Sequence, residues 1–102
     1  MAKRGEIWLV DLGLAQKTRP ALILSVAFGD ADRALLTIVS HTTALRGSRF
    51  EVALPVQFLR EGAFNAQSIV TIPVKHAIRK LGSLKPDELA AVEERVREWL
   101  GF

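Results

Sequence analysis

The sequence has no cysteine and only two histidines among its 102 residues. Without thiols the chain cannot form a disulfide, hold a metal through thiolates or use a cysteine nucleophile. The two histidines, His41 and His76, lie far apart in the sequence and are poor material for a metal centre. We therefore expect no metal and no cofactor, and any chemistry must rely on oxygen, imidazole and guanidinium groups.

Long apolar runs are also missing. None approaches the roughly 18 to 20 residues that a membrane-spanning helix needs, and the first residues, MAKRGEIW, contain no apolar signal-peptide stretch. We therefore expect a cytoplasmic protein with no membrane partner. With 49% hydrophobic residues, the chain is long enough for one compact core and too short for two, so a single domain over 1–102 is expected.

Positive charge is unevenly distributed along the chain. Residues 86–102 hold two basic and five acidic residues, a net charge of −3, whereas residues 1–85 hold twelve basic and six acidic residues, a net charge of +6. A basic body favours a polyanionic partner such as nucleic acid, because neutralising phosphates releases counterions. Ordinary solubilising charge is the alternative interpretation.

Short apolar runs rich in β-branched residues dominate the first two-thirds of the chain, and turn-forming segments separate them. The strands predicted from these runs lie at 6–12, 21–26, 34–39, 49–55, 68–72 and 78–84. The pattern predicts a mainly β protein, a small, curled antiparallel barrel over 5–84.

The last segment changes to a helical period. An apolar residue recurs every three or four positions, which predicts an amphipathic C-terminal helix over about 86–100; its apolar face would hold Leu89, Val92, Val96, Trp99 and Leu100. Lys85 is a weak N-cap, so we expect the start of the helix to fray.

The first candidate site residues stand at strand ends. Arg19 directly precedes a predicted strand, and its guanidinium could donate two hydrogen bonds to a phosphate. After the 34–39 strand, the imidazole of His41 could take a proton from a ribose 2′-hydroxyl. Thr42 and Thr43 could donate to phosphate oxygens. The alternatives are a solvated surface arginine and a histidine that satisfies a local backbone group.

Further polar residues lie in loops and on a later strand. Arg46 and Arg49 form a basic loop suited to contacts along a nucleic-acid backbone, with solvated loop charge as the alternative. Gln67, Ser68 and Thr71 could read base edges or only cap a turn. Phe28, Phe58 and Phe64 flank loops, so one of them could stack a base. Lys17, just before Arg19, is grouped with these nucleic-acid contacts.

Three blocks of sequence match a known family. They are RGEIWLVDL (4–12), RPALILS (19–25) and VSHTTALRGSRFEVALP (39–55), followed by LGSLKPDELAAV (81–92). Through their order and spacing, the sequence resembles the MazF/PemK toxins of bacterial type II toxin–antitoxin systems over essentially its whole length. The resemblance implies an SH3-like β-barrel with a C-terminal helix, a homodimer, and a cognate antitoxin that occupies the RNA site.

The resemblance also implies an activity. Members of the family are metal-independent endoribonucleases that cut single-stranded RNA at short sequences and so block translation. The 2′-hydroxyl attacks the adjacent phosphorus, leaving a 2′,3′-cyclic phosphate and a 5′-hydroxyl. By the family motifs, Arg19 would stabilise the transition state or protonate the leaving oxygen, and Thr42 would hold a phosphate oxygen.

The sequence departs from the family pattern at three places. An Asp-Gln pair found in many members, whose Asp is a proposed base, is replaced at about Thr71 and Ile72. The first loop, 13–18, is shorter and lacks a Gly-x-Glu segment. His41 stands before the catalytic threonine, where Cys, Val or Ile is usual.

Two hypotheses follow from these departures. His41 could replace the missing carboxylate as general base, although strand alternation predicts that it points away from Thr42. Alternatively, the chain is a non-catalytic RNA- or antitoxin-binding barrel that has lost its nuclease activity. A structural protein-interaction barrel with no nucleic acid is a third interpretation, and it fits the basic body poorly.

Overall fold

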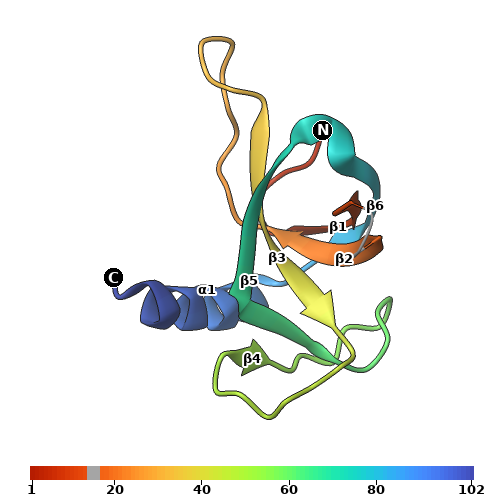
Figure 1. Ribbon diagram of the computed structural model, residues 1–102, viewed down its shortest axis with the longest axis vertical. Helices are drawn as coiled ribbons and strands as arrows, with labels where there is room; N and C mark the ends of the chain where they lie inside the picture. The colour runs from red at the N-terminus through yellow and green to blue at the C-terminus, as the bar shows by residue number, and fades with distance from the viewer. Residues whose placement is uncertain (14–16) are drawn as a thin grey trace.

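The computed structural model describes residues 1–13 and 17–102. The shortened first loop falls largely on positions 14–16, outside the described residues. The described chain forms six strands and one α-helix (Figure 1): β1 (Glu6–Asp11), β2 (Thr18–Ile23), β3 (Leu35–Thr42), β4 (Glu51–Val52), β5 (Ala63–Pro73), β6 (Ala77–Ser83) and α1 (Pro86–Leu100), with a 3₁₀ turn at Val74–His76. No helix in these described ranges is long and apolar enough to cross a membrane.

The strands form one antiparallel sheet in the order β4-β5-β3-β2-β1-β6. The sheet curls strongly, so that β1 and β2 cross the direction of β3 and β5 (Figure 1). The connection between β2 and β3 projects beyond the sheet as an extended loop, at the top of the same view. The predicted mainly β, barrel-like fold with a C-terminal helix is confirmed.

Several strand boundaries differ from the sequence pattern. β3 runs to Thr42, so His41 and Thr42 belong to the strand instead of following it. β4 has only two residues where a strand was predicted over 49–55, and β5 begins at Ala63 instead of residue 68. β2 begins at Thr18, so Arg19 belongs to the strand instead of preceding it. The alternation of apolar residues fails near the start of β5 because the strand bulges there. The sequence pattern therefore missed the first five residues of this strand.

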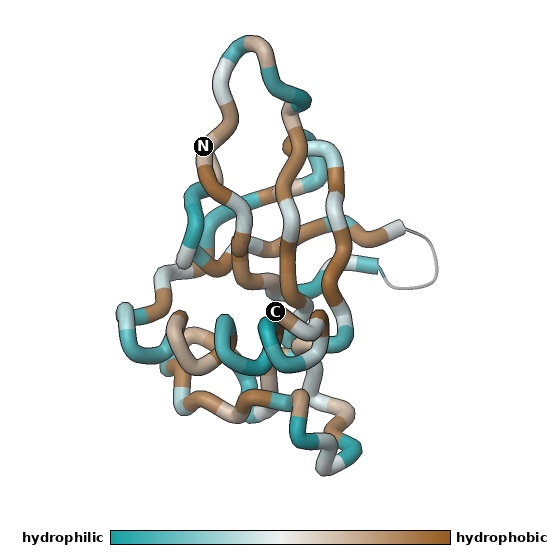
Figure 2. Tube along the Cα trace, turned by 90° about the vertical axis from the view of Figure 1, so that its left-hand side faces the viewer, coloured by the Kyte–Doolittle hydropathy of each residue, from teal (hydrophilic) through white to brown (hydrophobic). Residues whose placement is uncertain are grey.

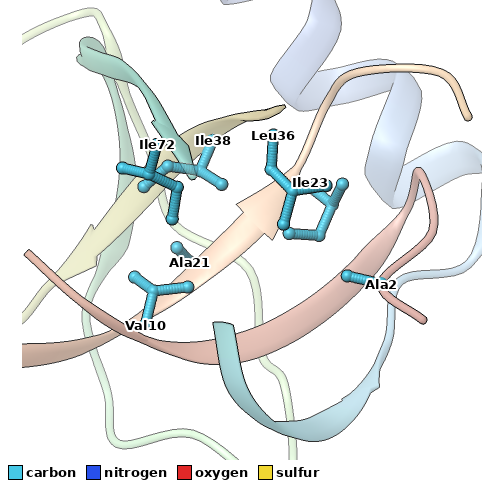
Figure 3. Close-up of a cluster of buried hydrophobic side chains, with 7 residues drawn as sticks. All are labelled: Ala2, Val10, Ala21, Ile23, Leu36, Ile38 and Ile72. Carbon is cyan, nitrogen blue, oxygen red and sulfur yellow. The ribbon is translucent and has the colours of Figure 1, made fainter. Parts of the chain in front are cut away.

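Both faces of the sheet are apolar. Along β2, Ala21 and Ile23 pack on one face while Leu22 packs on the other. The first cluster is drawn in Figure 3 and consists of Ala2, Val10, Ala21, Ile23, Leu36, Ile38 and Ile72. The second consists of Ile7, Leu22, Val39, Phe64, Leu84 and Val92. Two buried layers explain why the strands read as continuous apolar runs.

The helix α1 covers the second cluster through Val92, its one fully buried residue, and crosses the front of the molecule in Figure 2. The predicted fraying at its start is not seen. The backbone N–H of Lys85 donates to the carboxylate of Glu88 at 2.8 Å, which satisfies one of the free N–H groups there. At the other end, Trp99 is 45% exposed and meets Phe50 edge-on, so the predicted apolar face is buried only along its first turns.

Candidate active site

Arg19 and Thr42 come from neighbouring strands. β2 and β3 pair with Ala21 opposite Ser40, and two further residues of the same register place Arg19 opposite Thr42. Partners on neighbouring strands point to the same face of a sheet. Both side chains line one hollow of about 200 Å³, called the smaller hollow below. The two residues that the sequence assigned to a phosphate therefore lie together.

A bulge in β5 contributes the rest of this wall. The register of β3 against β5 shifts at Ser40, where residues 65–68 of β5 lie opposite a single residue of β3. Such a bulge redirects side chains away from the regular alternation. Asn65 and Ser68 from the bulge line the smaller hollow together with Ser40.

The hydroxyl of Ser40 is buried without a hydrogen-bond partner in the described chain. The residue is only 4% exposed, and within the described chain its Oγ is a buried polar atom without a hydrogen-bond partner. A buried polar group left unsatisfied costs about 1–3 kcal/mol. Because Ser40 lines the smaller hollow, a ligand with an acceptor oxygen there would satisfy this hydroxyl.

A second hollow of about 620 Å³, called the larger hollow, shares Arg19 and His41 with the smaller one. Phe58, Arg60 and Arg79 also line it. Among residues 1–13 and 17–102, no Asp or Glu lines either hollow.

The arginines of the larger hollow are not neutralised by any carboxylate of the described chain. Within residues 1–13 and 17–102, Arg19, Arg60 and Arg79 take part in no ion pair. The same ranges hold no cluster of three or more His, Cys, Asp or Glu side chains suited to a metal ion. Three unpaired guanidinium groups around one space favour an anionic ligand.

His41 lies between the two hollows. It is 5% exposed, and its ring meets that of Phe64 edge-on, with a centroid separation of 5.0 Å. Its strand partner is Phe64, whereas that of Thr42 is Ala63, so the two neighbours leave the strand on opposite faces, as alternation predicts. Both nevertheless line the smaller hollow, because it lies at the end of β3.

Burial lowers the pKa of His41 below its usual value of 6.5, so the imidazole is neutral at neutral pH. Among the described residues its ring nitrogens have no hydrogen-bond partner. The chain also runs close beside the ring, since a Cβ added at Gly62 would lie 2.9 Å from His41 Cε1 and would collide with the backbone oxygen of Thr42. Glycine is therefore needed at residue 62 to let the chain enter β5 here.

The hydroxyl of Thr42 is oriented by the turn that follows. Its Oγ1 accepts a hydrogen bond from the backbone N–H of Ala44 at 3.1 Å, the local arrangement that threonine favours after a strand. Because the oxygen accepts this bond, its own proton remains available for a ligand.

Only some of the residues predicted as RNA contacts lie at the two hollows. Thr43 lines the larger hollow. Lys17 and Gln67 are exposed and line neither hollow. Thr71 is bonded to the hydroxyl of Thr37 at 2.7 Å, further along β5.

Arg46 and Arg49 lie in the β3–β4 loop and line neither hollow. Three consecutive backbone N–H groups, beginning with that of Arg46, donate to the carboxylate of Glu51 and hold its pKa below the usual range. The guanidinium of Arg49 pairs with Glu98 at 3.1 Å and lies 4.6 Å above the Phe50 ring. Contacts of these two arginines with RNA stay predictions.

The structure adds four site residues that the sequence did not single out as contacts: Ser40, Arg60, Asn65 and Arg79. It also places Ser68 in the smaller hollow and Phe58 in the larger one, as candidates that the sequence had named. Ser40 lies on the central strand β3, Asn65 in the β5 bulge, Arg60 in the β4–β5 connection and Arg79 on the edge strand β6. Gly82 offered a signal, because it interrupts the predicted 78–84 strand where another part of the chain approaches closely.

The fold and the site define a small, curled β protein with a carboxylate-free polar site of arginines, hydroxyls and one buried imidazole. A family described as "PemK-like, MazF-like toxin of type II toxin-antitoxin system" matches residues 3–100. The chain therefore belongs to this toxin family.

Several solved structures have the same fold. One is an endoribonuclease in complex with its cognate antitoxin from Mycobacterial species, with a TM-score of 0.84, 25% identity and coverage of 100% of this chain and 97% of that chain. Another is MazF from Deinococcus radiodurans, with a TM-score of 0.84, 25% identity and coverage of 99% and 97%. The Mycobacterium tuberculosis toxin MazF-mt6 has a TM-score of 0.80, 26% identity and coverage of 95% and 97%. No curated protein sequence matches the chain.

Proposed function

We propose that this chain is a toxin endoribonuclease that cleaves single-stranded RNA at short sequences without a metal ion and thereby blocks translation. The observation that carries the proposal is the shared hollow of Arg19 and Thr42, next to a buried, neutral His41 and with no carboxylate in its lining. The family and the fold support an RNA-cleaving activity, since similar chains are endoribonucleases.

In the proposed reaction the 2′-hydroxyl oxygen of one nucleotide attacks the adjacent phosphorus, and the bond from phosphorus to the 5′-oxygen breaks. His41 accepts the proton of the attacking hydroxyl. Arg19 stabilises the charge that builds up on the phosphoryl oxygens, and Thr42 holds one of them. The leaving 5′-oxygen takes up a proton from water and His41 later releases its proton to water, so the products are a 2′,3′-cyclic phosphate and a 5′-hydroxyl.

We further propose that the active protein is a homodimer and that a cognate antitoxin occupies the RNA site. A mycobacterial endoribonuclease of this fold was solved with its cognate antitoxin, and MazF of Deinococcus radiodurans with MazE. Lys17, Arg46, Arg49, Gln67 and Thr71 remain proposed RNA contacts that lie outside the two hollows.

The decisive experiment is cleavage by the purified chain. Incubation with cellular RNA in the presence of a chelator should yield new 5′-hydroxyl ends at one short sequence, which sequencing of the ends will identify. Expression of the chain alone should arrest growth. Absence of any cleavage would contradict the proposal and leave a non-catalytic RNA- or antitoxin-binding barrel.

Ser40→Ala separates stability from activity. The cleavage rate should fall by roughly 10- to 100-fold, the loss expected when a hydrogen bond to a charged oxygen disappears. The free energy of unfolding should stay constant or rise, because the substitution removes a buried hydroxyl that has no partner in the described chain. Denaturant unfolding and cleavage kinetics measure the two effects.

Ser25→Ala is the matched control, since Ser25 Oγ accepts the backbone N–H of Thr37 at 3.0 Å. This variant should lose stability and keep its cleavage rate. A Ser40→Ala protein that is less stable than the wild type and equally active would show that Ser40 serves only the fold.

A further inference from the structure

Phe58 occupies a position in the larger hollow that only a glycine opposite it permits. It lies in the β4–β5 connection, and its ring packs on the backbone of Gly82 in β6. A Cβ added at residue 82 would lie 2.5 Å from both Cε1 and Cζ of the Phe58 ring. The φ angle of Gly82 is not in the left-handed region, so the backbone conformation does not require glycine. The close approach of the Phe58 ring is what requires glycine at residue 82.

The Phe58 ring is nevertheless not part of the core. It is 42% exposed, and it lines a space of about 620 Å³, within the range of roughly 300–1,000 Å³ typical of ligand pockets. An aromatic ring fixed on one side and open on the other toward a hollow is the arrangement on which nucleic-acid bases stack.

The charges around the ring favour a nucleotide over an apolar peptide. Arg60 follows Phe58 in the same connection, and Arg79 stands three residues before Gly82 on β6. Both line the larger hollow, together with Arg19. No carboxylate lines it, and in the described chain these arginines have no ion-pair partner. A ligand that combines a flat π-system with phosphates satisfies both features.

We propose that Phe58, supported by Gly82, is a stacking platform for an RNA base next to the scissile phosphate, and that Arg60 and Arg79 contact the phosphate of the same nucleotide. This inference rests on the proposed RNA-cleaving function for the identity of its ligand. Arg19 and His41 line both hollows, so the hollows adjoin, and a base stacked on Phe58 belongs to a nucleotide near the phosphate held by Arg19 and Thr42.

The test uses binding of a single-stranded oligonucleotide that carries the mapped cleavage sequence, with a 2′-deoxyribose at the scissile position to prevent reaction. If no sequence is mapped, the four homopolymeric single strands replace it. Phe58→Ala should weaken binding by about 5- to 150-fold, the effect of losing one base–aromatic stack. Phe58→Trp should bind as tightly as the wild type. In cleavage assays with a reactive strand, Phe58→Ala should raise KM more than it lowers kcat.

Gly82→Ala supplies the structural half of the test. The added methyl group displaces the ring, so this variant should lose as much affinity as Phe58→Ala, and the double variant should lose no more than either single one. Ser83→Ala, an exposed neighbour on the same strand, is the matched control and should bind normally. Should Gly82→Ala fail to fold, comparison of Phe58→Leu with Phe58→Trp decides whether an aromatic ring is needed.

The outcomes separate this inference from the proposed function. Wild-type binding by Phe58→Ala, or strictly additive losses in the double variant, would overturn the stacking platform even if the wild type cleaves RNA. If the wild type does not cleave RNA but binds the oligonucleotide, and Phe58→Ala weakens that binding, the stacking role of Phe58 is upheld and the nuclease function is refuted. If Phe58→Ala loses antitoxin binding but binds the oligonucleotide as the wild type does, the ring contacts a protein partner and the inference is overturned.

Discussion

Arg19→Ala is expected to lower the rate of RNA cleavage by roughly two to four orders of magnitude, in keeping with the loss of a main electrostatic stabiliser of the transition state. The guanidinium lines both hollows and has no ion-pair partner in the described chain. Because Arg19 is exposed, the melting temperature should hardly change. Single-turnover cleavage of the mapped sequence measures the rate.

Two comparisons sharpen this result. Arg19→Lys keeps the charge but loses the paired donors of guanidinium, so its rate should lie between those of the wild type and the alanine variant. Arg33→Ala removes an exposed arginine from the β2–β3 connection, which lines neither hollow, and should cleave within about twofold of the wild type. Expression of Arg19→Ala should no longer arrest growth. A fully active Arg19→Ala protein would show that the cleavage reaction does not take place in these hollows.

The elements that the sequence predicted best are those with a regular period. The C-terminal helix spans 86–100 as expected, because its apolar spacing and Pro86 define it locally. The placement of Arg19 and Thr42 in one site could also be predicted, since both residues belong to the motifs of the family. Strand register then brought them to one hollow.

The rest of the site depends on irregular and non-local geometry. The β5 bulge breaks the alternation that marks a strand, so Asn65 fell in a predicted loop and Ser68 only at the start of the predicted 68–72 strand. Ser40 directly follows the predicted 34–39 strand and nothing in the sequence marks it, because its burial without a partner is a property of the folded chain. Phe58 and Arg79 come from segments far apart in the sequence. No local pattern records that two such segments meet.

His41→Gln is expected to lower the cleavage rate by roughly two to four orders of magnitude, the typical contribution of a general base. Glutamine preserves a polar side chain of similar reach but cannot accept and hold a proton. The pH profile tests the role directly. A base must be neutral to act, so wild-type activity should rise as the pH rises through the pKa of His41, which burial places below 6.5, and should be level at neutral pH. This rise should be absent from the His41→Gln profile between about pH 5 and about pH 9.

The lowered pKa of His41 also makes a prediction about stability. The folded protein takes up a proton at His41 less readily than the unfolded chain, whose histidine titrates near 6.5. Stability should therefore fall as the pH drops from about 6.5 toward the folded pKa. Removing the imidazole should reduce that loss, which unfolding curves at several pH values will show.

His76→Gln is the matched control for both measurements. The His76 ring is bonded to the backbone oxygen of Asp11 at 3.2 Å and lines neither the smaller nor the larger hollow, so its variant should keep the wild-type pH profile. Equal rates and equal profiles for His41→Gln and the wild type would refute a role for His41 as base. Because the lining of both hollows holds no carboxylate, the proton of the 2′-hydroxyl would then pass to water or to a group from a second subunit.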